Sequence, residues 1–193
     1  MNFQFETEGR APIRVPVGRK DNTVFVASDD SRLFALDMTR GTRKWSFTAG
    51  EPVRHQPRVV GDSVFVVPEG RGMYSLRTIT GFQNWHQPQA TEFLAATPDI
   101  VYASDRLDNL LLLDRKGGAV TAVLRYGQLP IRVHNERTDR LYLASKDGMV
   151  VCIREIARQQ PIWHMYPERQ PVRAGVSSDN PEADDDAAMD DQQ

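Results

Sequence analysis

The sequence of 193 residues predicts an all-β chain made of about four copies of a four-stranded antiparallel unit. Three observations support this fold class. Short alternating runs recur about every 40 residues, a second set of runs follows with the same spacing, and all three tryptophans fall at one position of the repeat. Alternation of apolar and polar residues with a period of two is typical of strands that bury one face.

Two runs within each unit define the repeat. The runs with an aromatic centre are Val24–Ser28, Val64–Val67, Val101–Ser104 and Leu141–Ser145. A second run follows each of these after a polar turn, at Leu33–Asp37, Met73–Arg77, Leu110–Asp114 and Val150–Arg154. In both sets the centres are separated by 40, 37 and 40 residues. Two independent markers with the same spacing establish an internal repeat.

Two further strands complete each unit. A first strand is predicted at Ile13–Val17, Arg54–Val60, Phe93–Thr97 and Ile131–Asn135. A fourth strand is predicted at Lys44–Thr48, Asn84–Gln87, Val120–Arg125 and Ile162–Tyr166. Four short antiparallel strands in about 40 residues are typical of a β-propeller blade. We therefore predict propeller repeats over residues 1–166, with blades at about 10–49, 50–88, 89–126 and 127–166.

The tryptophans predict how neighbouring blades pack. Trp45 and Trp85 lie eleven residues after the centre of the second run, and Trp163 lies twelve residues after it. Gly41 and Gly81 each precede their tryptophan by four residues, where we expect the turn between the third and fourth strands. We expect the three indoles to wedge between adjacent blades, with their N–H groups on backbone carbonyls.

Over roughly residues 2–166 this arrangement resembles the tryptophan-docking motif of the pyrroloquinoline-quinone-like (PQQ-like) β-propeller repeat. It is similar to the propeller of the lipoprotein of the outer-membrane β-barrel assembly machinery. The motif weakens along the chain, since Ala122 replaces tryptophan in the third copy and Arg154 and Arg158 replace Asp and Gly in the fourth. The resemblance implies a location in the periplasm or cell envelope, whereas a true start at Met1, without an export signal, implies the cytoplasm.

The first residues repeat the end of a blade. Residues 3–14 align with residues 45–54, so residues 2–8 are predicted to form a fourth strand whose blade lacks its first three strands. We expect part of a larger propeller. The alternatives are a half-ring that associates with a second copy through open blade edges, and a small closed ring.

Charge separates the C-terminal residues from the repeats. Residues 167–193 contain eight acids and two arginines, for a net charge of −6, and no aromatic residue. We predict a disordered acidic tail over this range, because such a composition cannot offset the entropy of ordering. Residues 1–166 carry the remaining net charge of +4, and their arginines and lysines do not form a basic block. No nucleic-acid partner is therefore expected. No apolar run approaches the ~20 residues that span a bilayer.

The chemistry in the sequence favours binding over catalysis. Active quinoprotein dehydrogenases of the similar family use an adjacent cysteine pair and acidic calcium ligands, whereas this chain has only Cys152. We therefore predict no catalytic residue, no metal and no cofactor. The predicted function is a non-catalytic scaffold that binds a protein partner, which the sequence does not identify. The alternative is the remnant of a PQQ-dependent dehydrogenase or of a ligand-sensing domain whose site needs further blades.

Three arginines recur at the start of the predicted first strand, which the resemblance places along the central channel. They are Arg14, Arg54 and Arg132, preceded by Pro-Ile, Pro-Val and Pro-Ile. Three guanidinium groups at one mouth would favour an anionic ligand or an acidic peptide. The alternative is that each arginine pairs with a carboxylate of the neighbouring blade.

Overall fold

The computed structural model describes residues 11–165, and every regular element in this range is a β-strand. The strands form four antiparallel sheets in an open, propeller-like arrangement, which confirms the predicted fold class. The predicted strand at residues 2–8 and the predicted tail at 167–193 lie outside the described residues, as does Tyr166.

Each sheet is a meander whose strands pair in chain order. The first contains β1 (Gly18–Lys20), β2 (Thr23–Ser28), β3 (Arg32–Asp37) and β4 (Arg43–Thr48). The second contains β5 (Arg58–Val60), β6 (Ser63–Val66), β7 (Met73–Arg77) and β8 (Gln83–Gln87). The third contains β9 (Glu92–Ala96), β10 (Ile100–Ser104), β11 (Asn109–Asp114) and β12 (Val120–Arg125). The fourth contains β13 (Ile131–Val133), β14 (Leu141–Ala144) and β15 (Val150–Ile153).

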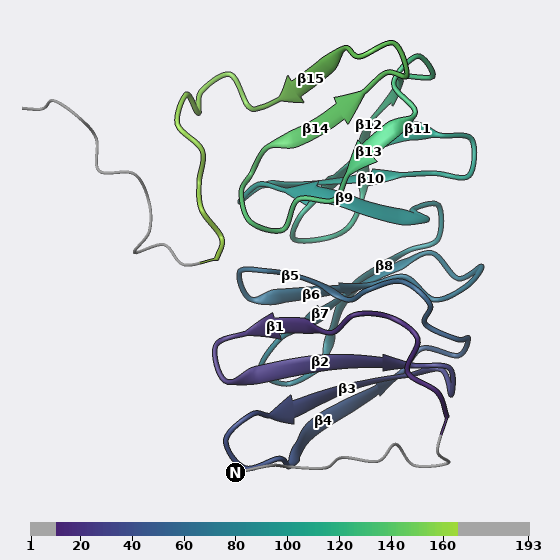
Figure 1. Cartoon of the computed structure of the whole chain (residues 1–193), viewed down its shortest axis with the longest axis vertical. Helices are drawn as coiled ribbons and strands as arrows, with labels where there is room; N and C mark the ends of the chain where they lie inside the picture. The colour runs from purple at the N-terminus through teal and green to yellow at the C-terminus, as the bar shows by residue number, and fades with distance from the viewer. Residues whose placement is uncertain (1–10, 166–193) are drawn as a thin grey trace, which may run out of the picture.

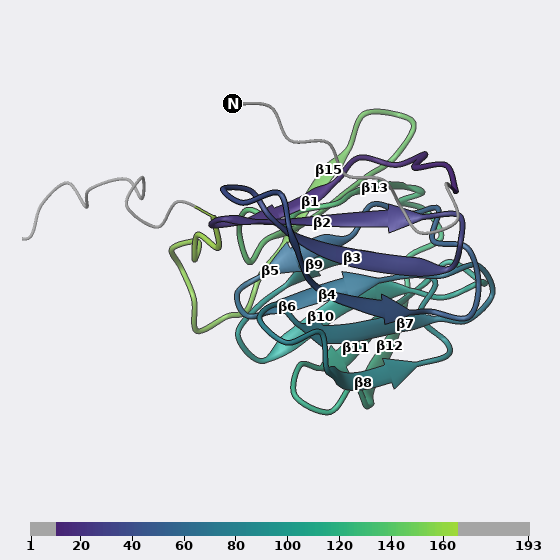
Figure 2. The same cartoon turned by 90° about the horizontal axis from the view of Figure 1, so that it is seen from below.

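The sheets stack face to face in chain order, with the first at the bottom of Figure 1 and the fourth at the top. Figure 2 looks along this stack and shows that the sheets overlie one another. The core consists of three apolar layers between successive sheets. Their fully buried side chains include Phe25 and Leu33, then Phe65 and Leu111, and then Leu141 and Leu143. Each sheet thus buries its apolar face against the next.

A tight turn joins the third and fourth strands in three of the sheets. It uses Gly41, Gly81 and Gly118, with φ of 66°, 72° and 72°, and each glycine N–H donates to the carbonyl of the residue four positions earlier. A positive φ costs glycine little and other residues about 1–2 kcal/mol. These glycines therefore return the chain along the edge of the third strand.

Two of the predicted first strands begin later than the sequence indicated. The range Ile13–Val17 is not a strand, since β1 begins at Gly18, and β5 begins at Arg58 instead of Arg54. Pro16 and Pro57 explain both corrections, because proline has no N–H to donate to a strand ladder. The first strands predicted for the third and fourth blades are correct. Phe93–Thr97 and Ile131–Asn135 match β9 and β13 to within two residues at each end.

The predicted strand Ile162–Tyr166 is wrong within the described residues, because the segment does not pair with β15. Its backbone instead joins the loop between β13 and β14, where Ile162 and Asp139 exchange hydrogen bonds and His164 N–H donates to the Arg137 carbonyl. The turn glycine is replaced by Arg158, whose N–H donates to Glu155. Without glycine at this position the chain does not turn back along β15.

Candidate functional site

Trp45 joins the first blade to the second. Its indole N–H donates to the Thr78 carbonyl over 3.0 Å, and its ring lies 5.7 Å from that of Phe25. A Cβ added at Gly81 would lie only 2.6 Å from two indole carbons. The glycine thus permits the turn and also leaves the space that the indole fills.

Trp85 repeats this contact between the second and third blades. Its indole N–H donates to the Arg115 carbonyl over 2.9 Å, and its ring lies 5.9 Å from that of Phe65. A Cβ at Gly118 would lie 2.5 Å from the indole. Gly118 lies 37 residues after Gly81 and is the glycine that the third copy of the motif retains, although it was not among the predicted docking residues.

Trp163 has different surroundings. It forms an isolated β-bridge with Thr138 in the loop before β14. Its buried indole N–H finds no hydrogen-bond acceptor in the part of the chain that the structure describes. Trp163 therefore does not repeat the indole-to-carbonyl contact of the other two tryptophans.

Arg14 and Arg54 lie together around one carboxylate. Arg14 Nε donates to Asp29 Oδ2 over 2.5 Å, and Arg54 Nε lies 3.6 Å from Asp29 Oδ1. Arg54 also donates to Glu69 over 2.8 Å. The hydrogen bond from Arg14, supported by the charge of Arg54, lowers the pKa of Asp29 although partial burial opposes this shift. Both arginines lie before the first strands and not within them.

Arg132 lies on β13 and binds acids of the third blade. Its guanidinium donates to Glu92 and to Asp108 over 2.8 Å each. A hydrogen bond from His134 also reaches Glu92 and, with Arg132, lowers the pKa of this half-buried acid. Glu92 was missed by the sequence analysis, although it occupies the repeat position of Arg54 and Arg132, 38 residues after one and 40 before the other.

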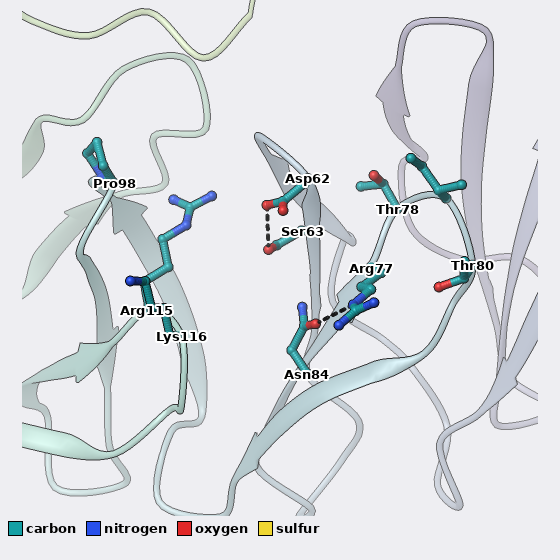
Figure 3. Close-up of a pocket in the computed structure, with 10 residues that line it drawn as sticks. Asp62, Ser63, Arg77, Thr78, Thr80, Asn84, Pro98, Arg115 and Lys116 are labelled. Atoms are coloured by element: carbon teal, nitrogen blue, oxygen red, sulfur yellow. Dashed lines mark hydrogen bonds between the residues drawn. The ribbon is translucent and has the colours of Figure 1, made fainter.

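A cavity of about 570 Å³ lies between the second and third blades. Figure 3 shows Arg115 reaching into it beside Asp62, with Arg77 held by Asn84 on the opposite wall. The Arg115 guanidinium donates to the carbonyls of Thr97 and Val60 over 2.7 and 2.8 Å, so it ties the two blades together. Burial lowers the pKa of Arg115, and the nearby acids partly offset this shift. Sequence analysis missed this residue, because nothing local marks a buried arginine.

The outward face of the fourth sheet is apolar and solvent-exposed. Register partners share a face, so Tyr142 lies between Val133 and Cys152, and Ala144 lies between Ile131 and Val150. The exposed fraction is 70% for Val150 and 47% for both Ile131 and Val133. Apolar residues gathered on one exposed face mark an interaction surface better than scattered ones do.

Comparison with sequence models of protein families identifies the family to which this repeat belongs. The sequence model of the family described as outer membrane protein assembly factor BamB matches residues 4–180. The chain belongs to the BamB family. No curated protein matches it in sequence.

Solved structures show the same fold as this BamB-family chain. BamB from Moraxella catarrhalis matches with a TM-score of 0.58 at 18% identity, over 81% of this chain and 54% of that one. The chain thus spans about half of the BamB structure that it matches. The computationally designed Ika4 protein matches with a TM-score of 0.61 at 13% identity, over 79% of this chain and 98% of that one.

The residues of this BamB-family chain do not fit the quinone cofactor of PQQ-dependent dehydrogenases. The chain has a single cysteine, so it cannot supply the adjacent cysteine pair that such a site uses. Among residues 11–165, no group of three or more His, Cys, Asp or Glu could hold a metal ion. The same range contains no helix long and apolar enough to cross a membrane.

Proposed function

We propose that this chain is a non-catalytic scaffold that binds protein through its fourth blade. The exposed apolar face of β13, β14 and β15 is the observation that carries the proposal. In the other blades, the corresponding apolar face is buried against the next sheet. A sheet face of this kind is stabilised when another polypeptide covers it. Membership of a family of assembly factors supports the same role.

A covalent trap tests this surface. The photoreactive residue p-benzoylphenylalanine at position 150 is expected to form adducts of defined mass, with another polypeptide or with a second copy of the chain. The matched control is the same residue at Gln83, an exposed position on the outer strand of the second blade. An excess of unmodified chain should suppress the adducts, whereas the Val150→Asp variant should not. Equal labelling from positions 150 and 83 contradicts the proposal.

The enzyme alternative has a direct test. Purified chain supplied with PQQ, calcium and a primary alcohol is expected to reduce an electron-accepting dye no faster than the heat-unfolded chain. The expectation follows from the missing cysteine pair. Dye reduction that depends on both the folded chain and PQQ would favour the dehydrogenase remnant.

Binding of an anion at the three arginines has less support, because each guanidinium already pairs with a carboxylate. The partners are Asp29 for Arg14, Asp29 and Glu69 for Arg54, and Glu92 and Asp108 for Arg132. Replacing all three arginines with Gln should leave the calorimetric titration of the chain with inorganic phosphate unchanged. A tenfold loss of phosphate affinity would revive the ligand-sensing alternative.

A further inference from the structure

We infer that the cavity between the second and third blades binds a small organic acid that carries two or more carboxylates. One carboxylate of this ligand takes the place of an acid that the first and third blades supply from their own chain and that the second blade lacks. The site is separate from the apolar face of the fourth blade, so the inference does not rest on the proposed function. Three observations lead to it.

The first observation is an acid at the turn between the third and fourth strands of a blade. In the first blade, Asp37 Oδ1 accepts hydrogen bonds from the N–H groups of Thr39 and Arg40, each over 2.9 Å. The bond from Arg40, supported by that from Thr39, lowers the pKa of Asp37 although burial opposes this shift. In the third blade, Asp114 accepts a hydrogen bond from Gly117 N–H. The N–H groups of this turn therefore stabilise a carboxylate.

The second observation is that the second blade has an arginine at this position. Arg77 lies 40 residues after Asp37 and 37 residues before Asp114. The turn keeps its glycine and its closing hydrogen bond. In the part of the chain that the structure describes, however, the N–H groups of Ile79 and Thr80 donate to no acceptor. The second blade thus presents the same two donors without the carboxylate that they bind in the first.

The change also leaves a positive charge beside these donors. In the first blade, Lys44 Nζ lies 3.5 Å from Asp37 Oδ2, so the two side chains form a neutral pair. The corresponding residues of the second blade are Arg77 and Asn84, and Arg77 Nε donates to Asn84 Oδ1 over 3.2 Å. Arg77 forms no ion pair with an acid among residues 11–165. Its guanidinium therefore retains donors for an external anion.

The third observation is that these groups line one cavity, whose volume is about 570 Å³. Ile79 and Thr80 line it beside the arginine of their turn, and Figure 3 shows Arg115 and Lys116 across the cavity from that arginine. Among the lining residues, three cations face one acid, Asp62, which lies beside Arg115 and partly offsets its charge. The free turn donors and the excess of positive charge thus meet in the same space.

The size of the cavity and the placement of its charges indicate the class of ligand. Pockets for small molecules commonly measure about 300–1,000 Å³, and this cavity falls within that range. Guanidinium groups bind carboxylates through paired, charge-assisted hydrogen bonds. Because cations lie on both walls, a ligand with carboxylates at both ends can bridge from Arg77 to Arg115 and Lys116. A single carboxylate can reach only one wall.

Titration of the ¹⁵N-labelled full chain with citrate tests the site by NMR. The backbone N–H signals of Ile79 and Thr80 are expected to shift and to saturate. The signals of Thr39 and Arg40 should stay in place, because Asp37 already accepts their hydrogen bonds. Acetate, which has one carboxylate, should bind about tenfold more weakly than citrate. Equal shifts at both turns, no saturable shift at the second turn, or equal affinity for acetate and citrate overturns the inference.

The Arg77→Asp variant restores the acid that the other blades have at this position. It is expected to lower the affinity for citrate by about tenfold or more, and to shift the Ile79 and Thr80 signals without ligand in the direction in which citrate shifts them. The matched control is Arg125→Asp, which makes the same change of charge at an exposed arginine on the opposite end of β12 from the cavity. The control should keep the affinity within about twofold.

A second variant keeps the test valid if Arg77→Asp does not fold. Arg77→Gln removes the charge without adding an acid and should weaken citrate binding about threefold or more. Equal losses in the Arg77 and Arg125 variants would show that citrate responds only to overall charge, and the inference would fail.

Two further probes separate a small organic acid from other anions. Inorganic phosphate should bind more weakly than citrate, because it cannot reach both walls. A blocked peptide of six glutamates should also bind no more tightly than citrate. Phosphate as tight as citrate, or a tighter peptide, overturns the assignment to a small organic acid. Saturating citrate should leave photocrosslinking from position 150 unchanged, so the failure of either test is distinguishable from the failure of the other.

Discussion

The contact between Trp85 and Gly118 makes a quantitative test of how the blades are joined. In the Gly118→Ala variant, the new Cβ would lie 2.5 Å from the indole, at a backbone φ of 72°. The positive φ costs about 1–2 kcal/mol for an alanine, and overpacking a filled core costs about 1–3 kcal/mol more. We therefore expect the free energy of unfolding to fall by about 2–5 kcal/mol.

Gly50 provides the matched control for this variant. Its φ is 81°, and a Cβ added there would meet nothing within 4 Å. The Gly50→Ala variant therefore has only the backbone cost of about 1–2 kcal/mol. The difference between the two variants isolates the clash with the indole at about 1–3 kcal/mol, or several degrees in Tm for a chain of this size.

Urea unfolding followed by tryptophan fluorescence and circular dichroism measures both variants. In a Trp85→Ala background the clash disappears, so Gly118→Ala should then cost no more than Gly50→Ala. Equal destabilisation by Gly118→Ala and Gly50→Ala in the wild-type background would refute the reasoning. It would show that the indole does not pack on the glycine.

Three further predictions concern the contacts between blades. Arg115→Met should reduce the free energy of unfolding by about 2–4 kcal/mol, because two carbonyls lose their donor, while exposed Lys116→Met should change it by less than about 0.5 kcal/mol. Trp45→Phe, which loses the bond to Thr78, should cost about 0.5–1.5 kcal/mol in the same urea assay. Burial lowers the pKa of His164, so the unfolded chain binds the proton better and stability falls as pH drops below about 6.5. Between about pH 7.5 and 5.5 the Tm of wild type should therefore fall further than that of His164→Gln, and equal falls would contradict this assignment.

The sequence predicted the middle of each blade well. The second and third strands depend on local alternation and on turn residues, both of which a window of ten residues contains. The fourth strand β12, Val120–Arg125, matches its predicted bounds. The strand predicted at Ile13–Val17 is wrong, because Pro16 has no N–H to donate to a strand ladder even though the apolar residues around it alternate.

The candidate site was harder to predict, because its partners are distant in sequence. The sequence showed three recurring arginines but not that Glu92, at the same repeat position, would neutralise Arg132. Arg115 has no local signal, and its role depends on carbonyls 18 and 55 residues away. Charge pairing of this kind becomes visible only after blade register is fixed, since register decides which side chains meet.

The fourth blade shows that a few residues decide whether a sheet has three strands or four. Its second and third strands keep the apolar pattern, so the sheet forms and buries Leu141 and Leu143. Its turn lacks glycine, and an arginine at a positive φ would cost about 1–2 kcal/mol. The ion pair of Arg158 with Glu155 and the bonds from Arg140 to the carbonyls of residues 158 and 159 stabilise the alternative path instead. A few kcal/mol in one turn thus decides whether the chain returns along β15 or joins the loop before β14.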